Sequence, residues 1–261
     1  MTTLILREDL GPIARLTLNT PASLNALSGP MIAALQSALD RLAEDAAVRV
    51  VILRGAGRAF CAGHDLREIT AARAAPDGGE GWFRDLFGAC SRMMQTLPAL
   101  PQPVIAQVHG LAAAAGCQLV AACDMAVAAE GTRFGVNGVN IGLFCSTPMV
   151  ALTRAIPPKA AFEMLSTGEF IDAARARELG LINRTAAPDA LDDATLALAQ
   201  TLAAKLPVAL RMGKAAFHAQ LGLSLAEAYA QTCDTITCNL MQPDTAEGIA
   251  AFLEKRPPNW G

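Results

Sequence analysis

Residues 104–124, VIAQVHGLAAAAGCQLVAACD, decide the fold class of this chain, and residues 59–68, AFCAGHDLRE, repeat their pattern. Each stretch passes from a strand-forming run through a glycine-containing turn into a segment of helical composition. A strand-to-helix junction of this kind leaves the first backbone N–H groups of the helix without partners. Two such junctions predict a pocket for a developing oxyanion, such as the enolate or tetrahedral anion of a thioester. Preformed N–H donors in a dry site are typically worth about 3 to 4 kcal/mol each.

The composition argues against several classes of protein. The chain has 261 residues, 52% of them hydrophobic, and a chain of this length buries about 70 to 75% of its unfolded surface on folding. A net charge of −3 without a basic cluster argues against nucleic acid as a partner. Polar residues interrupt the longest apolar region, which argues against a membrane span or a membrane partner. We therefore expect a soluble, globular protein.

The cysteines and the N-terminus indicate a compartment. The seven cysteines are odd in number, form no CxxC pair and lie mostly in apolar surroundings. This pattern predicts reduced thiols rather than disulfides or a metal site. At the N-terminus, the apolar run from Leu4 to Leu6 is too short for a signal peptide. We expect a cytoplasmic protein without a bound metal.

Strands alternate with helices in residues 1–190, which predicts an α/β core. A helix is expected to begin at Ser28, and residues 71–80 form either a lid or a plain surface loop. From Pro158 the pattern is helical, with residues 181–184 extended, and residues 191–261 are expected to form a helical C-terminal region. The strands expected before it are Leu4 to Leu6 and Ile13 to Asn19, paired as a hairpin, then Val50 to Leu53, Val104 to Val108 and Met125 to Ala128.

Five motifs, in order, resemble the crotonase, or enoyl-CoA hydratase/isomerase, superfamily over nearly the whole chain. They are LNALS at 24–28, AFCAGHDL at 59–66, PVIAQVHGLAAAAGCQLVAACD at 103–124, RFG at 133–135 and FLEKRPPNW at 252–260. The branch of enoyl-CoA hydratase domain-containing proteins is similar in AAGCQLVAACD and in GVNIGLFCSTP at 138–148. The order and spacing of the motifs carry this resemblance.

The resemblance implies a crotonase-like ββα spiral with a helical C-terminal trimerisation region, assembled as a homotrimer or hexamer. It implies an acyl-CoA thioester as the ligand, with no cofactor beyond the coenzyme A of the substrate. The oxyanion donors would be the backbone N–H groups of His64 and Ala115. The residues implied to line the ligand beside them are Ala62, Gly63, Leu66, Ala114 and Gly116. Relatives commonly have three glycines where this chain has Ala114, Ala115 and Gly116.

The resemblance also places two residues where hydratases use glutamates as acid and base. Gln118 stands at the first position and Gly138 at the second. An amide side chain orients water but does not exchange a proton near neutral pH. No carboxylate occurs between Glu130 and Glu163 to replace them. We therefore predict that the usual glutamate pair is missing.

Several other side chains have two interpretations. His64 either supplies an acid or base or contributes only its N–H. Cys145 is either a nucleophile activated by the following helix or a small apolar wall residue. Asp65 either faces the pocket or caps a helix. Asn137 and Asn140 either hold water or a polar acyl group, or form a turn.

Two basic residues are candidates for the coenzyme A phosphates. Arg67 follows the AGHDL segment, where relatives place a basic residue, and Lys255 lies near the C-terminus. The alternative is that both are solvated surface charges. The sequence as a whole predicts an acyl-CoA-binding, enoyl-CoA hydratase/isomerase-like enzyme with non-standard catalytic residues. The other hypotheses are a noncatalytic acyl-CoA-binding protein and a thioesterase that uses Cys145.

Overall fold

The computed structural model describes residues 3–260. Its largest element is a six-stranded sheet in the order β1-β2-β3-β4-β6-β9, in which the β1–β2 hairpin is antiparallel and the other pairs are parallel. The strands are β1 (Ile5–Leu10), β2 (Ile13–Leu18), β3 (Val50–Gly55), β4 (Val104–Val108), β6 (Met125–Ala129) and β9 (Arg184–Ala186). The hairpin and the three strands expected after it are confirmed.

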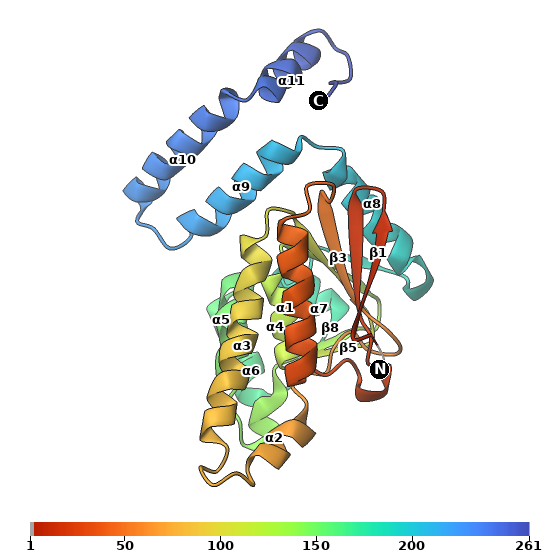
Figure 1. Cartoon of the computed structure of the whole chain (residues 1–261), viewed down its shortest axis with the longest axis vertical. Coiled ribbons are helices and arrows are strands. Elements are labelled where there is room, and N and C mark those ends of the chain that lie inside the picture. The colour runs from red at the N-terminus through yellow and green to blue at the C-terminus, as the bar shows by residue number, and fades with distance from the viewer. Residues whose placement is uncertain (1–2, 261) are drawn as a thin grey trace.

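Helices cover this sheet on both faces (Figure 1). Those on one face are α1 (Gly29–Ala43) and α3 (Glu80–Ala99), and α8 (Leu191–Ala203) lies on the other. Along β3, Val51 and Leu53 pack toward the first face and Val50 and Ile52 toward the second. Burial on both faces explains why β3 and β4 are continuous apolar runs rather than alternating ones.

Helix α1 begins as the sequence predicts. The Ser28 hydroxyl oxygen accepts a hydrogen bond from the Met31 N–H at 3.2 Å, and Pro30 occupies the first turn, where its missing N–H costs nothing. The buried side chains recur at helical spacing on one face: Met31, Ile32, Leu35, Ala38, Leu39 and Leu42. This stripe fixes α1 against the sheet.

A smaller sheet, β5-β7-β8, lies beside the first and creates the spiral. Its strands are β5 (Leu111–Ala113), β7 (Arg133–Gly135) and β8 (Ile171–Asp172). The chain runs from β4 through β5 into α4 (Ala115–Ala122), and then from β6 through β7 into the helical turn η2 (Asn137–Ile141). Each pass therefore has one strand in each sheet followed by a helical segment, which confirms the predicted ββα spiral.

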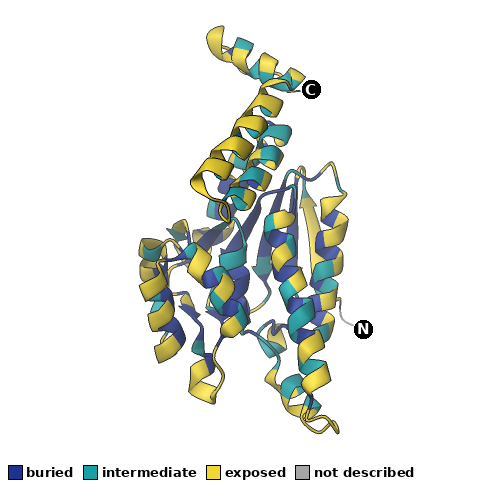
Figure 2. Cartoon of the chain, turned by 90° about the vertical axis from the view of Figure 1, so that its left-hand side faces the viewer, coloured by how far each residue is buried: buried dark blue, intermediate teal, exposed yellow. Residues whose placement is uncertain are grey.

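The remaining helices surround this spiral and extend beyond it. They are η1 (Pro21–Ser23), α2 (Leu66–Ala72), α5 (Ser146–Ala155), α6 (Pro158–Thr167), α7 (Ala173–Leu179), η3 (Pro188–Ala190), α9 (Pro207–Gln220), α10 (Leu225–Leu240) and α11 (Pro243–Leu253). Helices α9 to α11 project from one end of the molecule (Figure 1), and most residues of α10 are exposed (Figure 2). Within residues 3–260, no helix is both long and apolar enough to cross a membrane.

The structure adds elements that the sequence analysis does not assign. Residues 80–99 form helix α3. Strands β7 and β8 form the second sheet together with β5. The extended segment after α7 lies at 184–186 rather than 181–184. Helix α8, the first of the expected C-terminal region, packs directly on the large sheet.

Candidate functional site

A cavity of about 700 Å³ lies where the two glycine-containing junctions meet. Its wall comes from the η1 segment, the start of α2, one side of α3, the start of α4, and the stretch from η2 to α5. Ten of the residues implicated from the sequence lie in this wall: Ala62, His64, Asp65, Leu66, Arg67, Ala114, Ala115, Asn137, Gly138 and Cys145. Gly63, Gly116, Gln118, Asn140 and Lys255 are outside it.

The two expected oxyanion donors are close together and free. Neither the His64 N–H nor the Ala115 N–H donates a hydrogen bond to any of residues 3–260. Gly63 joins the junctions, because a Cβ atom added there would lie 3.4 Å from the Ala115 nitrogen and 2.9 Å from the Ala113 oxygen. Its φ of +93° also disfavours a side chain. Ala115 is the first residue of α4, so its N–H has no partner within the helix.

Ala114 has a strained backbone immediately before this donor. Its φ of 48° and ψ of −116° are unusual for a residue with a side chain. Such conformations cost of order 1 to 3 kcal/mol and persist only where the surroundings enforce them. The Ala114 N–H donates to the Gly135 oxygen at 2.8 Å, which ties the turn to β7. The strain is therefore located at the residue that orients the Ala115 N–H.

The His64 side chain has one fixed hydrogen bond. Its Nδ1 lies 3.2 Å from the Leu27 carbonyl oxygen, and its ring packs edge-on against Phe87 with 5.2 Å between centroids. Its Nε2 is buried and has no hydrogen-bond partner among the described residues. Burial lowers the pKa of the imidazole, an effect that the hydrogen bond to Leu27 opposes.

The residues that follow His64 have structural contacts. The Asp65 carboxylate caps α2 by accepting the Arg67 N–H at 2.9 Å, and it pairs with the Arg67 guanidinium at 3.1 Å. These contacts lower the pKa of Asp65. The Glu68 carboxylate accepts the Gly29 N–H at 2.8 Å, which links α2 to the start of α1. The capping interpretation of Asp65 is the one that the geometry supports.

Gln118 and Gly138 occupy tightly packed positions. Gln118 is buried on α4, and its Oε1 accepts no hydrogen bond from the described residues. Gly138 is buried in η2, where an added Cβ would lie 2.5 Å from the Leu143 oxygen and 2.8 Å from the Cys145 Sγ. Close approach of the backbone, rather than an unusual φ, keeps this position a glycine.

Cys145 is the residue before α5 and has a buried thiol. The Gly138 N–H donates to its Sγ at 3.3 Å. Burial raises the pKa of the Cys145 thiol, and this effect outweighs the opposite effect of the Gly138 N–H. A raised pKa is the wrong direction for a nucleophilic thiolate. The geometry therefore favours Cys145 as an apolar wall residue.

The two asparagines differ in their surroundings, and Lys255 is remote. Asn137 lies in the cavity wall, whereas the Asn140 amide donates to the Gly168 oxygen at 3.2 Å and joins η2 to α6. Lys255 follows α11, the helix that projects furthest from the core (Figure 1).

The cavity wall also contains residues other than the candidates named above. They are Ala22, Ser23, Leu24, Ala26, Arg58, Ile69, Phe87, Ile141, Leu143, Phe144, Ser146, Thr147 and Pro148. Arg58 stands just before the AFCAGHDL motif, so its proximity to the motif is the signal that marks it. Phe87 comes from α3, and its signal is the helical spacing of apolar residues after Glu80.

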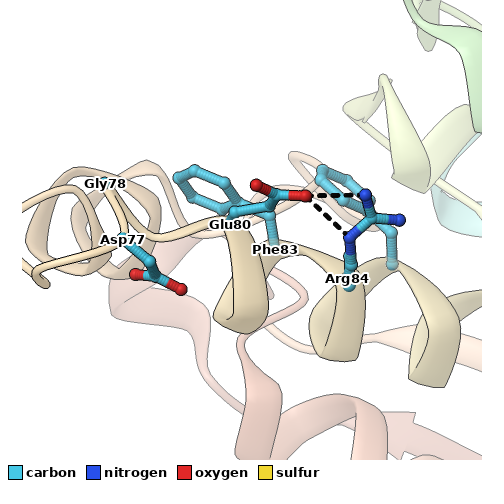
Figure 3. Close-up of a pocket in the computed structure, with 6 residues that line it drawn as sticks. Asp77, Gly78, Glu80, Phe83 and Arg84 are labelled. Atoms are coloured by element: carbon cyan, nitrogen blue, oxygen red, sulfur yellow. Dashed lines mark hydrogen bonds and ion pairs between the residues drawn. The ribbon is translucent and has the colours of Figure 1, made fainter.

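A second, shallower pocket of about 360 Å³ lies at the turn before α3 and shares Phe87 with the main cavity. Arg84 pairs with Glu80, which lies one turn earlier on α3 (Figure 3), with 2.7 Å between Nη2 and Oε1. The Asp77 carboxylate accepts the N–H groups of Gly79 and Gly81 at 2.9 Å each. The segment expected to be a lid or a loop is therefore a short turn braced by Asp77.

Within residues 3–260, no group of three or more histidine, cysteine, aspartate or glutamate side chains is arranged to hold a metal ion. The wall of the main cavity offers backbone N–H groups, apolar side chains and few charges. This arrangement suits a ligand with a polarisable carbonyl and an apolar tail.

The ββα spiral, with two free N–H groups at adjoining junctions, defines the class as crotonase-fold proteins. The chain belongs to the enoyl-CoA hydratase/isomerase family, whose model matches residues 8–261. It is 43% identical to a Xenopus laevis protein named enoyl-CoA hydratase domain-containing protein 3, mitochondrial, over 98% of this chain and 85% of that one.

Solved structures agree with this assignment. An enoyl-CoA hydratase of Mycobacterium smegmatis has a TM-score of 0.94 and 52% identity, with 98% of each chain covered. Human enoyl-CoA hydratase domain-containing protein 3 has a TM-score of 0.93 and 41% identity, and the comparison covers 98% of this chain and all of that one. The resemblance predicted from the motifs is confirmed.

These relatives correct the expected location. The predicted cytoplasmic compartment is contradicted, because the Xenopus, human and zebrafish relatives are named as mitochondrial proteins. The physical reason for the error is that free thiols argue against an oxidising compartment and do not separate the cytoplasm from an organelle. The short apolar run at the N-terminus likewise bears only on a secretory signal.

Proposed function

We propose that this protein binds an acyl-CoA thioester in the 700 Å³ cavity and polarises its carbonyl through the backbone N–H groups of His64 and Ala115. The observation that carries this proposal is a pair of backbone N–H groups that Gly63 brings together. Neither N–H group donates a hydrogen bond to a described residue. Membership of the enoyl-CoA hydratase/isomerase family supports the thioester as ligand.

The chemistry follows from where negative charge develops. An enolate or tetrahedral intermediate places that charge on the former carbonyl oxygen, and donors fixed before the reaction stabilise it without reorganisation. The N-terminus of α4 adds its partial positive charge at Ala115. Arg58 and Arg67 are the cationic residues in the cavity wall, and we assign them to the coenzyme A phosphates.

Hydration is a weak activity in this proposal. Among residues 3–260, the one carboxylate in the cavity wall is that of Asp65, which caps the first turn of α2 and pairs with Arg67. Gln118 and Gly138 supply no acid or base near neutral pH. This same observation favours a second candidate function, a noncatalytic acyl-CoA-binding protein, which shares the binding step and lacks turnover. The raised pKa of Cys145 argues against a thioesterase that uses this thiol.

A matched pair of ligands tests the proposal. Butyryl-CoA has the thioester carbonyl, and S-butyl-CoA has a methylene group in its place. Hydrogen bonds from two N–H groups should make the thioester bind at least about tenfold more tightly by calorimetry. The ¹³C resonance of the labelled carbonyl should also move downfield on binding. Equal affinity for the two ligands, or an unshifted resonance in the bound thioester, would contradict the proposal.

The assembly proposed with this function is a homotrimer or a hexamer. Helices α9 to α11 present large apolar side chains that the single chain leaves exposed: Phe217, Leu221, Leu225, Tyr229, Ile236, Leu240, Met241, Ile249, Phe252 and Leu253. Apolar surface on this scale is typical of a contact with another chain. A second copy of this chain is the partner that the family resemblance favours.

A further inference from the structure

The cavity needs a group that moves protons if it is to do more than bind a thioester. Its charged wall residues are Arg58, Asp65 and Arg67. Asp65 caps α2 and pairs with Arg67, and a guanidinium does not lose its proton in proteins. Burial raises the pKa of the Cys145 thiol, which keeps it protonated. His64 is therefore the wall residue left to exchange a proton near neutral pH.

The imidazole of His64 is held in one tautomer. Its Nδ1 lies 3.2 Å from the Leu27 carbonyl oxygen, and a carbonyl oxygen only accepts, so this contact assigns the proton to Nδ1. Nε2 of the neutral ring then has a free lone pair. Burial lowers the pKa of this imidazole, so the ring is neutral at pH 7.

The free lone pair has no use within the fold. Nε2 is buried and accepts no hydrogen bond from the described residues, and an unpaired buried acceptor costs about 1 to 3 kcal/mol. Phe87 packs edge-on against the ring and lines the same cavity, so it fixes the imidazole plane without offering a polar donor. A cost of this kind in the wall of a cavity calls for a catalytic or ligand-binding explanation.

We propose that Nε2 of His64 is the base of this cavity and removes a proton from the α-carbon of a bound acyl thioester. The proposal rests on the proposed function, because the backbone N–H of the same residue donates to the thioester oxygen. The α C–H bond breaks and an N–H bond forms at Nε2. The electron pair forms the carbon–carbon double bond of the enolate, and the charge on oxygen is held by the N–H groups of His64 and Ala115. Reversal returns the proton to the α-carbon.

Exchange of the α-hydrogens of butyryl-CoA in D₂O tests this step directly. Butyryl-CoA has no double bond to hydrate, so ¹H NMR of the exchange isolates proton transfer. His64→Asn keeps an amide donor where Nδ1 lies and removes Nε2, and His64→Gln places a neutral amide near Nε2. Each variant should exchange about 10² to 10⁴ times more slowly than the native protein, the usual contribution of a general base.

His109→Gln is the matched control. Its Nε2 lies 2.8 Å from the Gly57 oxygen, and it is outside the cavity wall, so its loss should leave the exchange rate unchanged. The Kd for butyryl-CoA should be the same in the native protein and in both His64 variants. A merely structural role would instead weaken binding and lower the melting temperature.

The pH profile provides a second readout. The native exchange rate should fall on the acid side through a pKa below the ordinary 6.5 of histidine, and this limb should be absent from the residual rate of both variants. A native protein that binds butyryl-CoA without exchanging its α-hydrogens would overturn the proposal, and so would a native rate in a folded His64→Asn or His64→Gln variant. Failure to bind the thioester at all would instead contradict the proposed function.

Discussion

At the scale of single residues, the site depends on backbone conformation more than on side-chain chemistry. Gly63 brings the two junctions together, and Ala114 takes a strained conformation to orient the next N–H. The motifs identify these positions, because the resemblance to the crotonase superfamily assigns the donors to His64 and Ala115. The strain at Ala114 is not visible in the sequence, since alanine, unlike glycine, does not indicate a positive φ.

The strain at Ala114 predicts that glycine is better tolerated there. Ala114→Gly should raise the free energy of unfolding by about 1 kcal/mol, because relief of the positive φ outweighs the added entropy of the unfolded chain. Chemical denaturation with linear extrapolation measures the change. Ala113→Gly, in the regular strand β5, is the control and should destabilise the protein. A less stable Ala114→Gly variant would show that the turn is not strained.

Gln118 predicts a gain of hydration on restoring one carboxylate. Gln118→Glu should raise crotonyl-CoA hydration by about a hundredfold, the lower end of the range for one acid or base group. Gln118→Met, which is similar in size and cannot ionise, should give no increase.

Gly138→Glu should destabilise the protein, because its Cβ would collide with the Leu143 oxygen. Initial rates from the loss of enoyl absorbance measure hydration by each variant. Fast hydration by the native protein would contradict the predicted absence of the acid and base pair.

At the scale of elements, the sequence predicts the helices and strands that are marked by a pattern within their own segment. Apolar runs mark β3 and β4, and Ser28 with Pro30 marks the start of α1. The buried residues of α3 recur at helical spacing, so this helix was predictable in principle. The strands of the small sheet are only two or three residues long, and pairing between distant segments creates them. No local pattern identifies such strands.

The contact that fixes α9 on the core gives a prediction at this scale. The Asp124 carboxylate accepts hydrogen bonds from the Val104 N–H and from Lys214 Nζ, both at 2.7 Å, and its other oxygen lies 2.9 Å from His218 Nε2. Lys214 also donates to the Leu97 and Gln102 oxygens. Removing one partner of a buried ion pair typically lowers the free energy of unfolding by several kcal/mol, because the other charge is left buried and unpaired.

We therefore expect Lys214→Met and Asp124→Asn each to lower the free energy of unfolding by about 3 kcal/mol or more. The double variant should lose less than the sum of the two, since neither charge is then left alone. Denaturant titration of the four proteins measures the coupling. The exposed pair Arg175 and Glu178 is the control, where the corresponding loss should be under about 1 kcal/mol. Strictly additive losses at Lys214 and Asp124 would contradict the buried pair.

At the scale of the whole molecule, the spiral core and the projecting helices differ in how their apolar residues are used. The core buries its large side chains between the sheet and the helices on both faces. Helices α10 and α11 leave theirs exposed in the single chain (Figure 2). Tyr229 is 66% exposed and Phe252 83%. Surfaces of this kind gain stability when a second chain covers them.

This difference predicts assembly through the projecting helices. Light scattering at micromolar concentration should give a mass of at least three times the 27.2 kDa of one chain. Leu225 and Tyr229 lie one turn apart on α10, so lysine at both positions places two charges on one apolar face. The Leu225→Lys, Tyr229→Lys variant should dissociate, because burying unpaired charges is costly. Gln231→Lys, at an exposed polar position of the same helix, should remain assembled. A native protein that stays monomeric would contradict assembly through these helices.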